Sequence, residues 1–89
     1  MAYNPKNLSV LAYANGFTLW HYTSTDDGTV VDNTGYFNAA ADMLRVGDMI
    51  LANVATSSSP GAGVFLVTAN PTGSVAVANL TPFGATDTD

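Results

Sequence analysis

The sequence predicts a mainly β fold with a minor α component: a small antiparallel β-barrel or sandwich with one short helix and an extended N-terminal arm. Three observations predict this class. The apolar segments are short and are separated by Asn-Gly, Asp-Asp-Gly and Ser/Pro/Gly clusters, as in strands joined by turns. The polar residues are mostly Thr, Ser and Asn, and all the acids are aspartate, a set that favours turns and strands. A single segment has the apolar periodicity of a helix.

Residues 1–16 are expected to form an arm and a first short element. In the arm, Asn4-Pro5 favours an extended backbone, because proline pushes the preceding residue out of the α region. The segment 8–13 is compatible with a short strand or with one helical turn, and periodicity does not decide over so few residues. Asn15-Gly16 then marks a turn.

A strand is predicted at 17–24, where nearly every residue favours β structure. Alternation places Phe17, Leu19 and His21 on one face and Trp20 with Tyr22 on the other. The following Asp26-Asp27-Gly28 has the residues of a tight turn, so 29–32 is expected to return as a strand and close a hairpin.

The helix is predicted at 35–45, where the apolar period changes. Phe37, Ala40, Ala41 and Leu44 recur at the i, i+3, i+4 and i+7 positions of one helix face. Gly47 supplies the stop.

Three antiparallel strands are predicted after the helix, at 49–55, 64–68 and 74–80, with turns at 57–63 and 70–73. The first two are apolar at nearly every position, which implies burial on both faces. Residues 17–83 are therefore expected to form one β-rich domain, followed by a flexible acidic tail at 84–89.

Composition excludes several functions. The chain has 89 residues and a net charge of −5 with two basic residues, too few to neutralise several phosphates, so nucleic-acid binding is not expected. Without cysteine there is no disulfide framework and no thiolate zinc site. The first apolar stretch is too short to span a bilayer, so neither a membrane helix nor a signal peptide is expected.

No motif indicates catalysis. The single histidine, His21, lies in an alternating strand and is expected either to pack or to face the surface, not to act in catalysis or bind a metal. The acids near position 27 do not match the calcium-loop spacing, and Gly61-Ala-Gly63 lacks the lysine of a phosphate-binding loop. The sequence therefore predicts a protein that is not an enzyme and uses no metal or cofactor.

The surface pattern indicates an assembly subunit. Charged residues make up only 10% of the chain, the strands are apolar on both faces, and Tyr3, Tyr13 and Tyr36 are expected to be exposed. Two alternatives stay open: a small globular domain with a neutral surface, and a receptor-binding module that stacks sugars on Trp20, Tyr22 and Tyr36.

Three segments resemble a family of small proteins encoded by tailed bacteriophages and prophages. They are Met1-Ala-Tyr-Asn-Pro-Lys-Asn-Leu-Ser9, Leu19-Trp-His-Tyr-Thr-Ser-Thr-Asp26 and the run from Thr34-Gly-Tyr-Phe-Asn to Val46-Gly-Asp-Met-Ile50. The resemblance implies a virion structural protein, a capsid decoration (cement) protein that is made in the bacterial cytoplasm and binds the outside of the head.

The resemblance also implies the partners of such a protein, namely the major capsid protein and further copies in a homotrimer. The alternative within the virion is a head-fibre, spike or tail-associated module that binds carbohydrate or a receptor. The residues expected at a protein interface are Tyr3, Asn4, Pro5, Leu8, Tyr13, Trp20, Tyr36 and Phe65.

Overall fold

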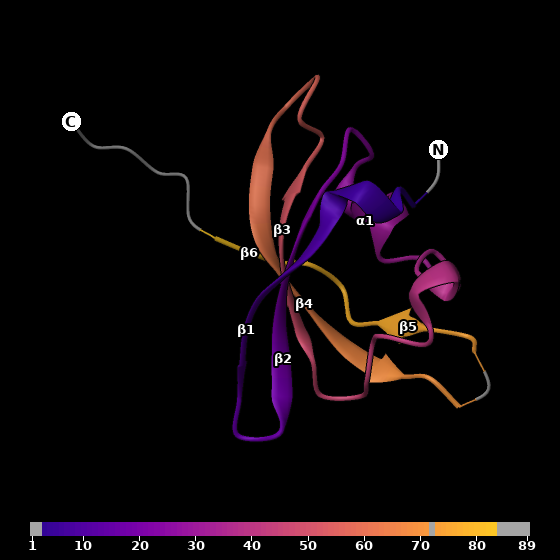
Figure 1. Cartoon of the computed structure of the whole chain (residues 1–89). Helices are drawn as coiled ribbons and strands as arrows, with labels where there is room; N and C mark the ends of the chain where they lie inside the picture. Colours follow the sequence, from indigo (N-terminus) through magenta and orange to yellow (C-terminus); the bar gives the residue numbers. More distant parts are fainter. Residues whose placement is uncertain (1–2, 72, 84–89) are drawn as a thin grey trace.

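The computed structural model describes residues 3–71 and 73–83, and its centre is one six-stranded mixed sheet (Figure 1). The strands run in the order β1-β2-β3-β4-β5, and β6 also pairs with β4. Their bounds are β1 Leu8–Ala14, β2 Phe17–Thr23, β3 Met49–Val54, β4 Gly61–Ala69, β5 Ala76–Val77 and β6 Thr81–Pro82. The mainly β class with one short helix is confirmed, whereas the sheet is open, so a barrel is not confirmed.

The first two strands form a hairpin, which decides the open question about segment 8–13 in favour of a strand. Asn15 and Gly16 both have positive φ, 54° and 81°, as a two-residue hairpin turn requires. Ala14 therefore pairs with Phe17, and the register continues to Leu8 opposite Tyr22 with one irregularity between Val10 and Ala12.

The third strand runs parallel to the second, so the expectation of a fully antiparallel sheet is wrong. Leu19 pairs with Met49 and Thr23 pairs with Asn53. Parallel neighbours require a long crossover, which here is the segment 24–48. In Figure 1 the β1–β2 and β3–β4 turns consequently point in opposite directions.

The parallel pairing also explains why 29–32 is not a strand. The edge of β2 that a returning hairpin would use is occupied by β3, so the segment forms a short helix, α1 Gly28–Val31, preceded by an extended Asp27. Val31 is fully buried, so the apolar side chain reaches the core without strand pairing.

The helix predicted at 35–45 is also wrong. The segment is a series of turns with one 3₁₀ helix, η2 Asn38–Ala40, and most of its main-chain hydrogen bonds join residues three apart. A positive φ of 94° at Gly35 turns the chain before it. Helix periodicity nevertheless identified the residues that the segment buries, Phe37, Ala40 and Leu44, each about 1% exposed.

The three strands predicted at 49–55, 64–68 and 74–80 correspond to β3, β4 and β5, which pair antiparallel as predicted. The lengths of β4 and β5 differ from the prediction. β4 extends over Gly61–Ala69, and the strand expected at 74–80 is reduced to the two residues of β5. The chain then pairs antiparallel with β4 as β6. At this pairing a Cβ on residue 63 would collide with the Thr81 carbonyl. Glycine at this position permits the close approach.

One face of the sheet carries the core. Alternate residues of β2, β3 and β4 point to it, and the crossover covers it. The buried cluster comprises Trp20, Tyr22, Val31, Phe37, Ala40, Leu44, Ile50, Ala52, Val54, Phe65, Val67 and Val75. Only this face is covered by the described chain, so the expected burial of β3 and β4 on both faces is not met within one copy.

Residues 3–7 do not form an extended arm. Tyr3 stacks on Tyr22 with ring centroids 5.6 Å apart, and the Asn4 backbone N–H donates to the Tyr22 hydroxyl at 3.0 Å. Asn4 also caps the 3₁₀ helix η1, Pro5–Asn7, by accepting from the Lys6 N–H. The segment therefore folds back onto its own core. The predicted acidic tail at 84–89 lies outside the described residues.

Candidate protein-interaction surface

The second face of the sheet, opposite the core, is apolar and lacks a cover among the described residues. We call it the outer face. Cross-strand pairing aligns Leu19, Met49 and Leu66 in one row and His21, Leu51 and Val64 in the next. These side chains are half-buried except Leu66, which is 45% exposed. When one face of a sheet contacts solvent, the side chains on that face are usually polar. The apolar outer face therefore differs from the solvent-exposed sheet surface of a monomeric protein.

The outer face is also uncharged. None of β1, β2, β3 and β4 contains Asp, Glu, Lys or Arg. The side-chain polar groups in the two rows are limited to the imidazole of His21, whose Nε2 lies 2.8 Å from Oδ1 of Asn53. A surface with no charge to desolvate is suited to contact with another protein.

The β1–β2 hairpin carries further exposed apolar side chains, but Val10 pairs with Trp20 and Tyr13 pairs with Thr18, so both belong to the core side of the sheet and not to the outer face. Val10, Leu11 and Tyr13 are 56%, 54% and 66% exposed. Tyr13 is therefore exposed as expected and remains available to a partner, as do Asn4 and Pro5, while Leu8 is half-buried.

Two of the predicted interface residues are in the core instead. Trp20 is 6% exposed and Phe65 is fully buried, so neither side chain is available to a partner in this fold. The sequence indicated that β3 and β4 are apolar on both faces, but it did not indicate which face of the sheet the chain covers. Leu66 and Leu51 were missed for this reason.

Tyr3 and Tyr36 are half-buried, because they belong to an aromatic cluster with Tyr22 and Phe37. The Tyr36 hydroxyl lies 2.9 Å from the Tyr22 hydroxyl and donates to Oδ2 of Asp26 at 2.8 Å. Asp26 is 4% exposed, so this hydrogen bond partners one oxygen of a buried carboxylate, while Oδ1 is buried without a hydrogen-bond partner among the described residues. These tyrosines stabilise the connection between β2 and the crossover.

Burial raises the pKa of Tyr36, and the hydrogen bonds that its hydroxyl makes with Tyr22 and Asp26 add to the increase. Because the unfolded chain releases this proton near pH 10, the stabilisation is complete below that pH and is lost as the pH rises above it. We expect Tyr36→Phe to flatten the fall in unfolding free energy above pH 10, measured by urea unfolding at a series of pH values. Tyr13→Phe, at an exposed hydroxyl, is the control. An unchanged slope for Tyr36→Phe would contradict this assignment.

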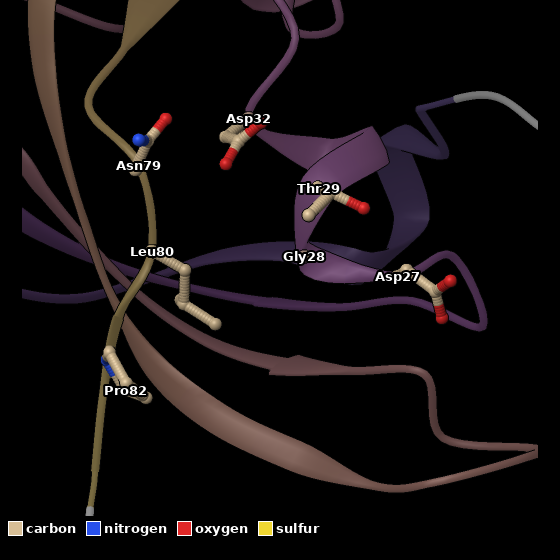
Figure 2. A pocket seen from close by; sticks show the side chains of 7 residues that line it. All are labelled: Asp27, Gly28, Thr29, Asp32, Asn79, Leu80 and Pro82. Atoms are coloured by element: carbon tan, nitrogen blue, oxygen red, sulfur yellow. The ribbon is translucent and has the colours of Figure 1, made fainter.

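A separate cleft of about 600 Å³ lies where α1 meets the segment before β6. Figure 2 shows Asp32 and Asn79 at one end and Asp27 at the other, with Gly28 and Thr29 between the two aspartates. A Cβ at Gly28 would lie 3.1 Å from Leu80, so glycine lets α1 approach this segment. The two carboxylates do not by themselves define a ligand.

Among residues 3–71 and 73–83, no three His, Asp or Glu side chains form a group that would hold a metal ion. In the same residues, no helix has the length and hydropathy needed to cross a membrane.

No protein-family model matches the chain, and no curated protein or solved structure matches it either. Conclusions about its function therefore depend on the sequence and on the surface described above.

Proposed function

We propose that the protein is a structural subunit of a phage virion, a capsid decoration protein that binds major capsid proteins through its outer face. The observation that carries the proposal is the uncharged apolar outer face, which one copy leaves uncovered. The resemblance of three segments to small phage proteins is the reason for proposing that the assembly is a phage virion.

The energetics of a small chain support an assembly role. A domain of this size buries a modest fraction of its surface, so a cover on the outer face adds stability that its own core lacks. Apolar area contributes about 25 cal/mol per Å² when it leaves water. Contacts repeated over a particle surface act together, so each one can be weak.

The carbohydrate-binding alternative expects Trp20, Tyr22 and Tyr36 to be accessible to a sugar, and the structure does not favour this. Trp20 and Tyr22 are 6% and 0% exposed, so their rings cannot stack on a sugar. The Tyr36 ring packs edge-on against Phe37, and its hydroxyl is hydrogen-bonded to Asp26.

Mutation of the outer face tests the proposal. We expect the wild-type chain to be present in many copies in purified phage particles, by quantitative mass spectrometry, and to lie on the head in cryo-electron microscopy. Leu66→Asp places a charge on the face, at its most exposed row position, and should reduce incorporation at least about tenfold. Met43→Asp is the matched control, because Met43 is 48% exposed and lies outside the sheet.

Circular dichroism of the purified variants separates loss of binding from loss of folding. Absence of the wild-type chain from particles, or its presence only at the tail, would refute a capsid decoration role. Wild-type incorporation of folded Leu66→Asp would exclude the outer face as the binding surface.

A further inference from the structure

The two long edges of the sheet differ in how they are protected. On β4, the edge opposite β3 pairs with β5 and β6, and Ala78 and Phe83 donate main-chain hydrogen bonds to Leu66 and Ala62. On β1, the edge opposite β2 has no main-chain partner among the described residues. The free row of N–H and C=O groups on β1 is a template for another strand.

The sequence of β1 has few of the features that normally block such pairing. Charged residues and proline are the usual means, and Leu8–Ala14 contains neither. All of its residues after Leu8 are exposed. The register irregularity between Val10 and Ala12 leaves Leu11 without a partner on β2, and this β-bulge is the one protective feature that the strand has.

A second copy of this chain is the occupant that fits. A strand that pairs with β1 must itself have a free edge and must bring no charge. Among the described long strands, β1 alone has an edge of this kind, because β2 and β3 are internal and β4 is covered on both sides. Each copy has a net charge of −5, but none of the charged residues is on β1 or β2. Pairing at β1 therefore brings together the uncharged parts of two like-charged chains.

We propose that β1 is a self-association site, at which the β1 strands of two copies pair antiparallel about a two-fold axis near Leu11. A two-fold arrangement is self-complementary, since each strand offers the other the same groups that it receives. The two sheets then form one continuous sheet, and the two outer faces lie side by side. This dimer differs from the homotrimer that the resemblance implies, and it does not depend on the proposed binding of the outer face to capsid proteins.

Sedimentation velocity over a concentration series tests the proposal. We expect the wild-type chain to form a dimer of twice 9.2 kDa. Leu11→Lys places like charges close together at the axis and should weaken dimerisation at least about tenfold. Val46→Lys is the matched control, because Val46 is also an exposed apolar residue, at 64%, but lies in a loop. It should dimerise like the wild type.

Two additional measurements keep the test independent of folding. Tyr13→Lys, at another exposed β1 position, should reproduce the loss of dimer if Leu11→Lys fails to fold. Hydrogen exchange of the wild type should slow within residues 8–14 as its concentration rises. A monomer at all concentrations, a trimer, or wild-type dimerisation of folded Leu11→Lys would each overturn the proposal, whether or not the chain is found in virions.

Discussion

Replacing Phe65 with alanine should lower the free energy of unfolding by about 3–5 kcal/mol, the cost of removing a fully buried aromatic ring. Phe65 is 0% exposed and pairs with Ile50 across the centre of the sheet. Because domains of this size have a net stability of only a few kcal/mol, the variant should be largely unfolded. Urea unfolding followed by far-ultraviolet circular dichroism measures the change.

Leu66→Ala is the matched control for Phe65→Ala. Leu66 is the next residue in β4, but it points to the outer face and is 45% exposed. Its truncation should cost less than about 1 kcal/mol in the monomer. If Phe65→Ala were as stable as Leu66→Ala, the assignment of the two faces of β4 would be incorrect.

The local sequence was sufficient to predict β2, because apolar side chains of its two faces alternate along segment 17–24. Trp20 and Tyr22 are buried while Phe17, Leu19 and His21 are half-buried, as the alternation in 17–24 predicts. The turn at Asn15-Gly16 was predictable because a two-residue hairpin needs positive φ, which Asn and Gly tolerate.

The errors have a common cause in long-range pairing. Whether 29–32 forms a strand depends on the edge of β2, which residues 49–53 occupy from far along the chain. The segment 35–45 has the apolar periodicity of a helix, but residues far along the chain form hydrogen bonds with its main-chain carbonyls and with one of its side chains. The Asn70 side chain donates to the carbonyls of Ala41 and Leu44, and Asn38 accepts from the Val75 N–H. None of these partners is visible in a local window of sequence.

The sequence predicted that the protein has an uncovered apolar surface, but it did not predict which residues form that surface. Apolar residues on both faces of 49–55 and 64–68 indicated that one face lies outside the core of a single copy. Which face is covered depends on where the crossover packs, and it packs on the side of Trp20 and Phe65. The expected interface residues from the core were therefore wrong, while Tyr13, on the hairpin, is exposed.

The second large effect is expected at Asp48, a buried carboxylate that connects three parts of the fold. Asp48 is 1% exposed. Its Oδ1 accepts from the Thr18 N–H at 3.0 Å, and its Oδ2 accepts from the Trp20 Nε1–H and the Arg45 N–H, both at 3.1 Å. Both oxygens are thus used as acceptors, and they join the β1–β2 hairpin to the end of the crossover.

Asp48→Asn should lower the free energy of unfolding by about 2–4 kcal/mol, because the new amide group faces at least one N–H donor whichever way it turns. Asp42→Asn, at an exposed position, is the matched control and should change stability by less than about 0.5 kcal/mol. Trp20 fluorescence during urea unfolding reports both variants, since Trp20 is the single tryptophan and contacts Asp48 directly. If Asp48→Asn were as stable as Asp42→Asn, the carboxylate would not be the connection between hairpin and crossover, and their packing would depend on apolar contacts alone.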